Sequence, residues 1–440
     1  MAAPSKHTRR KFLRQASTGA AALIAAPYFV PARVLGAEGA TPPSDRIVMG
    51  VIGTGGMGKA NLDMFMSERD VQMVAACDVD ARHLAEGVEK VNAKYDNLDC
   101  KAYSDFRELL AREDIDAVAV VTPDHWHALA SIAAARAGKD IYCEKPLANS
   151  VGEGRAICEA VRENGRILQT GSHERSTPSV RQACELVRNG RLGKIHTVRI
   201  NLPTDESHHR RAMKLTDVPP PMPVPEGFDY DFWLGHTPEV PYTEKRCHFG
   251  WRFILAYGGG EMTDRGAHII DIAQLALGMD ETGPVEYRGR GAASSTSLFD
   301  AFFNFEFENT YANGVKMIGT SKHGPRGVGF EGDQGKLFVH VHGGKLEAEP
   351  TSLLEEPIGA GEIQLGRTPG HRRNFLDCLR TREAPLATAE IGHRTATICH
   401  LNNIAFRLGR PLTWDPVAEK TDDDQANDML TPKMREPWSL

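Results

Sequence analysis

Arg46-Ile-Val-Met-Gly-Val-Ile-Gly-Thr-Gly-Gly-Met-Gly58 joins an apolar run to a glycine-rich turn. A second apolar run follows and ends at Asp78, about 20 positions after the turn, which is the spacing of a dinucleotide-binding strand, turn and helix unit. In such a unit Gly53 permits the tight turn, Gly55 lets the backbone approach a pyrophosphate, and Gly58 lets the helix pack closely on the sheet. The N-terminus of that helix would face the phosphates. The stretch therefore predicts a Rossmann domain that binds a dinucleotide.

The acidic residue after the second strand indicates which dinucleotide is bound. A carboxylate at Asp78 can accept hydrogen bonds from the adenosine ribose hydroxyls and repel a 2′-phosphate. We therefore expect NAD as the cofactor, with NADP as the alternative.

Strand and helix patterns alternate from residue 45 to residue 169, as a doubly wound parallel sheet requires. Residues 117–123 predict a buried strand, and residues 140–146 predict the next strand and its turn. Ligands of such sheets bind outside the carboxyl ends of the strands. The residues expected to bind the cofactor are therefore Gly53, Gly55, Gly56, Met57, Gly58, Asp78, Thr122, Pro123, His127, Glu144 and Lys145.

A second domain is predicted over residues 170–415, where the pattern changes. It should be α+β with a mostly antiparallel open sheet. The region between the expected strand 194–200 and Pro241 is polar and proline-rich. We therefore expect it to lack regular structure and to wrap the rim of the active site or a neighbouring subunit. Residues 416–440 should form a C-terminal tail. The expected helices are 178–189 and 264–277, and the expected strands are 194–200, 285–291, 300–307, 315–319, 327–331 and 335–341.

The first 37 residues predict an export signal. Thr8-Arg-Arg-Lys-Phe-Leu13 precedes a short, weakly apolar run rich in alanine, which is typical of a twin-arginine signal. We therefore expect the protein in the periplasm or another extracytoplasmic compartment. Cleavage near Ala37 and retention as an anchor both remain open. No later segment has the roughly 20 apolar residues that a membrane span needs.

Composition excludes some classes of partner. The chain has 440 residues, a hydrophobic fraction of 41% and a net charge of −6, which fits a two-domain enzyme. No Lys/Arg-rich run follows residue 14, so nucleic acid is not an expected partner. The eight cysteines are scattered without a disulfide framework.

Four motifs together resemble the Gfo/Idh/MocA family, which includes glucose-fructose oxidoreductase and inositol dehydrogenase. The motifs are Gly53-x-Gly55-x-x-Gly58, Thr122-Pro123-x-x-x-His127, Glu144-Lys145-Pro146 and Asp264-x-x-x-His268-x-x-Asp271. The resemblance covers nearly the whole chain after the signal, and the glycine-rich run before Asp264 is most similar to the exported branch. It implies that Lys145, Asp264 and His268 are the catalytic group. It also implies a homo-oligomer formed through the second sheet.

The residues themselves support the same catalytic group. Oxidising a sugar hydroxyl removes a hydride and a proton, so a positioned base must accept the proton. His268 is our first candidate, because Asp264 lies four positions earlier on one face of the expected helix and would stabilise an imidazolium. Lys145, at a strand end, is the second candidate for the base, or it could polarise the reacting oxygen.

Substrate and metal ligands are predicted less directly. Aromatic, cationic and imidazole side chains suit sugar faces and hydroxyls, so the expected substrate-binding residues are His173, Arg175, Trp251 and Arg252. A metal could be held by Asp264, His268 and Asp271 with His125 or His127. Hydride transfer needs no metal and no tight ligand spacing occurs, so we expect none.

Three functions are compatible with these residues. The first is an oxidoreductase acting on a sugar, polyol or sugar derivative, with a tightly bound cofactor because a nicotinamide pool is absent outside the cytoplasm. The second is an NAD-dependent glycosidase that oxidises its sugar transiently and eliminates the aglycone. The third is a non-enzymatic sugar-binding protein on the same fold. The first two would use the same Lys145, Asp264 and His268, so the sequence does not separate them.

Overall fold

Six parallel strands form the first domain in the computed structural model, which describes residues 42, 45–355 and 357–440. Their order is β3-β2-β1-β4-β5-β6, so the chain direction across the sheet reverses between β1 and β4. The predicted doubly wound parallel sheet is therefore confirmed, and its ligand crevice lies at this reversal. The strands are β1 (Ile47–Ile52), β2 (Val71–Cys77), β3 (Lys101–Tyr103), β4 (Ala117–Val120), β5 (Asp140–Cys143) and β6 (Leu168–Thr170).

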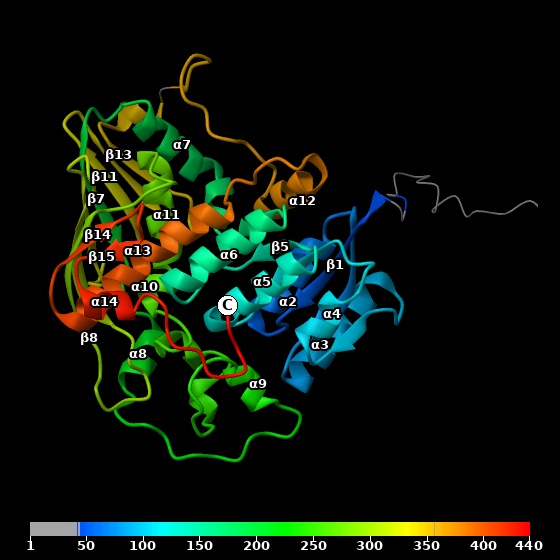
Figure 1. Cartoon of the computed structure of the whole chain (residues 1–440). Helices are drawn as coiled ribbons and strands as arrows, with labels where there is room; N and C mark the ends of the chain where they lie inside the picture. Colours follow the sequence, from blue (N-terminus) through cyan, green and yellow to red (C-terminus); the bar gives the residue numbers. More distant parts are fainter. Residues whose placement is uncertain (1–41, 43–44, 356) are drawn as a thin grey trace, which may run out of the picture. The chain divides into compact units, whose positions relative to one another are not determined.

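Helices cover both faces of this sheet (Figure 1). Three of them begin at side-chain caps that satisfy free backbone N–H groups. Asp80 accepts from the backbone of Arg82 and His83 at the start of α3. Asp105 accepts from Arg107 at the start of α4, and Ser150 accepts from Glu153 at the start of α6. The helices are α2 (Gly56–Met66), α3 (Ala81–Tyr95), α4 (Phe106–Leu110), α5 (His127–Arg136) and α6 (Val151–Glu163).

The second domain contains a nine-stranded sheet, ordered β13-β12-β11-β7-β10-β9-β8-β14-β15. Among the described strands of this sheet only β7 and β10 pair in parallel, which confirms a mostly antiparallel sheet. The three strands that sequence did not predict, β13, β14 and β15, are short and lack a long apolar alternation. The strands are β7 (Ile195–Asn201), β8 (Glu286–Ala292), β9 (Asn304–Thr310), β10 (Lys316–Thr320), β11 (Gly327–Gly332), β12 (Lys336–His340), β13 (Leu346–Glu349), β14 (Leu412–Asp415) and β15 (Lys420–Thr421).

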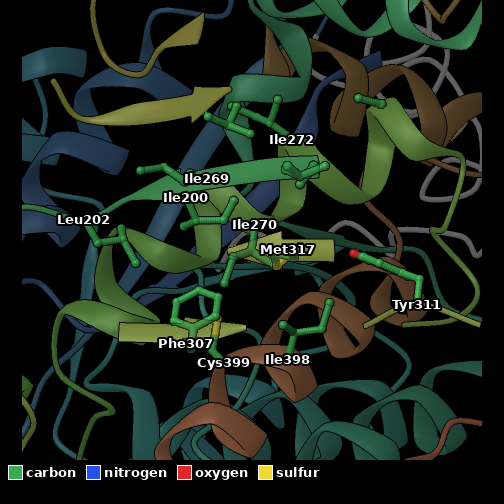
Figure 2. Packing of buried hydrophobic residues seen from close by; sticks show 14 of the residues in the cluster. Ile200, Leu202, Ile269, Ile270, Ile272, Phe307, Tyr311, Met317, Ile398 and Cys399 are labelled. Carbon is green, nitrogen blue, oxygen red and sulfur yellow. The ribbon is translucent and has the colours of Figure 1, made fainter. Parts of the chain in front are cut away.

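One face of this sheet is covered by α7 (Pro178–Arg188), α11 (Gly266–Leu277) and α13 (Ala389–Leu408). Ile269 and Ile270 of α11 belong to the same buried cluster as Ile200 and Met317 of the sheet (Figure 2). Burying these apolar side chains provides the main stabilisation of the second domain. On the opposite face, alternate residues of β9, β10 and β12 stay partly exposed.

The region from β7 to Pro241 was expected to lack regular structure, and this expectation is wrong in part. It contains α8 (Ser207–Met213) and α9 (Tyr230–Leu234), and α10 (Glu261–Asp264) follows it. These helices are too short for a helical periodicity to identify them; α9 begins where the Asp229 side chain accepts from the backbone of Phe232. The region does contact the first domain, since Asp229 N donates to Val79 O over 2.9 Å.

Two late segments also pack on the first domain. Helix α12 (His371–Thr381) places Phe375 and Leu376 in the core formed by β1 and β2. After α14 (Asp424–Asp428), the tail brings Trp438 against Trp126, with ring centres 5.0 Å apart. Within the described residues, no helix has the length and apolar character to cross a bilayer. The predicted signal segment, 1–37, lies outside those residues.

Candidate active site

A cleft of about 580 Å³ runs along the carboxyl ends of the first sheet and is closed on the other side by the 202–265 region and α11. It brings together most of the predicted site residues. Those that line it are Gly53, Gly55, Gly56, Met57, Asp78, Thr122, Pro123, His127, Glu144, Lys145, His173, Trp251, Arg252, Asp264 and His268. Gly58 and Arg175 do not line it.

The glycine turn has the geometry that a dinucleotide requires. Gly53 has a φ of +93°, and a Cβ there would lie 2.5 Å from Val121 O, so a side chain is excluded. A Cβ on Gly58 would lie 2.2 Å from Gly53 O, which explains why the helix can pack this closely on the turn. Gly56, by contrast, has no atom within 4 Å of a built Cβ. Gly58 is therefore a packing residue, while the space above Gly56 can accept a phosphate.

Asp78 lies where the adenosine ribose would bind. Its Oδ2 accepts from Thr54 N and Thr54 Oγ1 over 2.7 and 3.1 Å, and its Oδ1 accepts from Asp80 N over 2.9 Å. A carboxylate offers about four acceptor positions, so capacity remains for a ribose hydroxyl. Together with the open glycine turn, this arrangement fits NAD.

The nicotinamide end of the cleft is held in place by His127. Its ring nitrogens lie 2.7 Å from Pro146 O and 3.1 Å from Thr122 O, so one buried side chain connects the ends of two neighbouring strands. Thr122 Oγ1 is buried and has no partner among the described residues, which leaves it available to a cofactor amide. Glu144 instead directs Oε1 to the amide of Asn61, 3.0 Å away.

Lys145 and Asp264 form the central ion pair of the site. Lys145 Nζ donates to Asp264 Oδ1 over 2.6 Å and to Asp264 O over 2.8 Å. Burial tends to raise the pKa of Asp264, but the charges of Lys145 and Arg252 outweigh it and hold that pKa far below its usual value. Asp264 is therefore ionised, and it orients the ammonium group of Lys145.

The expectation that Asp264 and His268 lie on one helix is wrong, whereas the expected electrostatic support is present, since the charge of Asp264 raises the pKa of His268 against the larger opposing effects. The helix is interrupted at Arg265, so Asp264 ends α10 while His268 lies in α11. No hydrogen bond joins the two side chains among the described residues. Asp264 instead pairs with a lysine 119 positions away, a contact that helical spacing cannot indicate.

His268 is buried and uncharged. Its side chain lies beside two other histidines, with ring centres 4.7 Å from His173 and 5.2 Å from His342. Burial, and then the charges of Lys145, His173 and His342, lower its pKa well below the ordinary histidine value. The imidazole is therefore in the form that accepts a proton at neutral pH. Sequence reasoning missed His342, which lies in the turn after β12, because no motif marks it.

The substrate side of the cleft is aromatic and cationic. The guanidinium of Arg252 lies over the rings of Trp251 and Phe249, with distances of 4.4 and 4.8 Å to the ring centres. Its Nε is 4.0 Å from Asp264 Oδ2. This stacking holds a cation at the cleft wall, where it can contact a hydroxyl or an acidic group of a sugar.

Asp124 is a further lining residue that the sequence analysis did not select. It is 5% exposed. Burial raises its pKa well above the usual value, against the opposing charge of Lys145. The carboxyl group is therefore in a state that can donate a proton. Its position directly after Thr122-Pro123, at a strand end, was the available signal.

Arg175 is not a substrate-binding residue in this structure. Its side chain is 2% exposed and forms ion pairs of 2.7 Å with both Asp271 and Asp280. A charge so far from water needs such partners, which explains its position outside the cleft.

The metal ligands considered from sequence do not come together. Asp271 is occupied by Arg175, and His125 and His127 face backbone carbonyls. Three other groups have potential ligand atoms within 4.8 Å of one another. They are His173, His268 and His342; Asp80, His83 and His248; and Glu206, His208 and His209.

The glycine turn and Asp78 define a dinucleotide-binding fold, and Lys145, Asp264 and His268 lie in its cleft. The chain belongs to the Gfo/Idh/MocA oxidoreductase family. Residues 47–172 match its NAD-binding Rossmann fold, and residues 176–440 match its C-terminal alpha/beta domain.

Two individual relatives match about two thirds of this chain, at 28% and 33% identity. The chain is similar to levoglucosan dehydrogenase from Pseudarthrobacter phenanthrenivorans, at 28% identity over 62% of this chain and 55% of that protein. It is also similar to 2,7-anhydro-N-acetylneuraminate hydratase from Mediterraneibacter gnavus, at 33% identity over 68% of this chain and 69% of that protein. The chain spans about half the length of several curated relatives, between 42% and 55% of their residues, and the levoglucosan enzyme is one of these relatives.

Solved structures share the fold. The WlbA dehydrogenase from Bordetella pertussis, crystallised with NADH and UDP-GlcNAcA, superposes with a TM-score of 0.62 at 17% identity, over 84% of this chain and 99% of that chain. This likeness concerns the fold alone.

Proposed function

We propose that the protein is an NAD-dependent oxidoreductase that acts on a CH–OH group of a sugar, polyol or sugar derivative and keeps its cofactor tightly bound. The observation that carries this proposal is the presence, in one cleft, of the glycine turn, the Lys145–Asp264 pair and a buried neutral His268. Family membership and the similarity to a levoglucosan dehydrogenase support a carbohydrate substrate.

Each residue has a distinct task in this reaction. Gly53, Gly56 and Asp78 would hold NAD, which supplies an acceptor for the hydride of the substrate carbon. Lys145, oriented by Asp264, donates a hydrogen bond to the reacting hydroxyl and stabilises negative charge that develops on its oxygen. His268 accepts the hydroxyl proton. The aromatic wall around Trp251 excludes water from the sugar face.

The proposal is tested with purified protein and a panel of levoglucosan, methyl glucosides, glucose and myo-inositol. The released nucleotide is first identified and quantified after denaturation. Reduction of the bound nicotinamide by a panel member, followed by its near-ultraviolet absorbance, is the expected result. Protein that retains no nucleotide, binds no added NAD and reduces none with any panel member would contradict the proposal.

A second candidate is an NAD-dependent glycosidase or related enzyme that oxidises the sugar transiently and eliminates a group. The favouring observation is Asp124, a buried carboxyl group in the cleft whose raised pKa suits a proton donor to the leaving group. The similarity to a hydratase is in line with such chemistry. Product analysis separates the two, because the second releases an aglycone without net redox change, whereas the first yields an oxidised sugar.

Asp78 should select NAD. Replacing Asp78 with serine removes both the repulsion of a 2′-phosphate and the acceptor for the ribose hydroxyls, so the preference for NAD over NADP should fall. Binding of the two nucleotides to protein stripped of its cofactor is the measurement, with Asp99→Ser, an exposed site outside the cleft, as control. A wild-type protein that retains only NADP would refute this assignment.

We propose that the protein is exported folded, with NAD already bound, by the twin-arginine route. The support is the Arg9-Arg10 pair, the alanine-rich run that follows it and the eight cysteines, which are all buried free thiols. Such a route explains why no disulfide scaffold is needed. It also explains how a cytoplasmic cofactor could accompany the chain.

Replacing Arg9 and Arg10 with lysines should retain folded, NAD-loaded protein in the cytoplasm, because the transport signal depends on the arginine pair. Fractionation of cells expressing each form, followed by nucleotide analysis, measures this. A matched variant with Arg14→Lys should still be exported. Unchanged export of the double variant would remove the twin-arginine interpretation.

We also propose a homo-oligomer formed through the open face of the nine-stranded sheet. That face is only partly exposed at alternate residues and carries ordered ion pairs, such as Arg199 with Glu331 at 2.7 Å. Light scattering during gel filtration should give a molar mass at a multiple of the 48.2 kDa chain, allowing for any cleaved signal.

A further inference from the structure

The burial of His268 raises a question that the proposed function leaves open. The side chain is 5% exposed, so a proton that it accepts from the substrate cannot pass directly to bulk water. Its environment also disfavours the charged form, because burial and Lys145 lower its pKa. A base in this position needs a neighbouring group that carries the proton away before the next turnover.

Two histidines are placed for this task. The side chains of His173 and His342 are 41% and 38% exposed, so both connect the interior of the cleft with solvent. One nitrogen of each of the three rings lies within 4.8 Å of the others. A single water that makes two hydrogen bonds of about 2.8 Å can span such a separation.

The backbone holds His342 toward the cleft at an energetic cost. Its φ is +63°, a left-handed conformation that is uncommon outside glycine. Its N–H donates to Glu174 Oε1 over 3.2 Å, and its Nε2 lies 3.9 Å from the same oxygen. His173 Nδ1 is 4.0 Å from that oxygen as well. One buried carboxylate thus lies beside both partly exposed rings, and its charge acts to raise the pKa of His342 against the larger lowering by burial.

We propose that His173 and His342 form a proton relay that carries the substrate hydroxyl proton from His268 to solvent. The step is balanced: the O–H bond of the substrate breaks, an N–H bond forms on His268, and the same proton passes through His173 or His342 to water or buffer. The inference rests on the proposed function, because it deepens the role of the same base.

A metal ion held by the three rings is the competing interpretation. The 4.8 Å upper bound on the distances between their ligand atoms allows a metal as well as a bridging water, so the surroundings of the rings have to distinguish the two. A ligating histidine normally donates its second N–H to an acceptor, whereas His268 Nδ1 has no partner among the described residues. The charge of Lys145 also acts on this ring and would repel a dication.

The relay is surrounded by several other charged or titratable groups that any variant must preserve. The groups that interact electrostatically with one or more of the three rings are Lys145, Glu174, Asp264, Arg265, Arg326 and His371. All of them stay unchanged in the variants below.

The test compares His173→Gln, His342→Asn and the double variant with wild type in steady-state turnover. Asparagine tolerates the left-handed backbone at position 342 but cannot carry a proton. The substrate is the panel member that wild type oxidises fastest. An external electron acceptor reoxidises the bound NADH, so that His268 must pass on a hydroxyl proton in every turnover. His340→Asn is the matched control: it lies two residues earlier, pairs with Glu347 and does not line the cleft.

In dilute buffer and at saturating substrate the double variant should lose about 10-fold or more in kcat, with a larger solvent deuterium effect, while any loss of substrate contact at His173 appears in KM. Added imidazole should restore kcat, because it replaces the missing proton carrier. His340→Asn should match wild type in both buffers. Unchanged kcat in the double variant, a loss that imidazole does not restore, or a loss that follows removal of a metal ion would each overturn the relay.

A second measurement does not depend on turnover. Imidazole nitrogen NMR of the protein with bound nucleotide follows exchange of the His268 ring proton with water. This exchange should be slower in the double variant, because the path from His268 to solvent is removed. An unchanged exchange rate would overturn the relay, whereas failure of the proposed function would appear separately, as a wild type that oxidises no panel member.

Discussion

His268→Ala is expected to leave nucleotide binding intact while slowing reduction of the bound nicotinamide by about 10² to 10⁴-fold, the range for losing a general base. The physical reason is that the neutral ring is the group placed to accept the hydroxyl proton. Single-turnover absorbance changes measure the rate, and nucleotide release after denaturation checks that the site is intact. His323→Ala, which removes a histidine that is 89% exposed, is the control.

The pH dependence gives an independent check of the same assignment. His268 acts as a base only when unprotonated, and its pKa is lowered, chiefly by burial. The wild-type rate should therefore rise with pH below the ordinary histidine range and be flat above it. That limb should vanish in His268→Ala. A near-normal single-turnover rate in this variant would transfer the role of base to Lys145.

Lys145→Ala should also impair the reaction, since it removes the hydrogen bond to the reacting oxygen. Its effect should be non-additive with His268→Ala if both groups act on one hydroxyl. Asp264→Asn should be milder than either. It keeps an oxygen for Lys145 but loses the charge that orients the ammonium group.

Arg175→Ala is expected to lower the free energy of unfolding by about 3–5 kcal/mol, because Asp271 would remain buried without its counter-charge. Asp271 has a side-chain exposure of 0%, so water cannot replace the guanidinium. Denaturant unfolding measures the change. Lys90→Ala is the control: this lysine pairs with Asp63, whose side chain is 61% exposed, and its loss should cost under about 1 kcal/mol.

A double variant separates the ion pair from a substrate role. Replacing Arg175 with methionine and Asp271 with leucine removes both charges, so stability should recover relative to Arg175→Ala. If the Arg175→Ala variant is as stable as wild type but binds its sugar more weakly, Arg175 is a substrate-binding residue as the sequence predicted.

The first domain was predictable because its signals are local. Gly53 and Gly58 lie in a single turn, where steric exclusion of a Cβ depends on neighbouring backbone alone. The alternation of strands and helices follows from the period of apolar residues. The short helices α8 and α9 lacked such a period, since a segment of five or seven residues completes at most two turns.

The sequence by itself determined the Rossmann turn, the class of the second sheet and the identity of Asp78, Lys145 and His268 as cleft residues. Tertiary structure alone decided which groups meet. Lys145 contacts Asp264, 119 positions away in the sequence, and Arg175 contacts Asp271, 96 positions away. His342, in the turn after β12, lies beside His268 of α11. The physical reason is that periodicity specifies which face of an element is buried, whereas contacts between distant side chains depend on strand order, helix breaks and the docking of one layer on another.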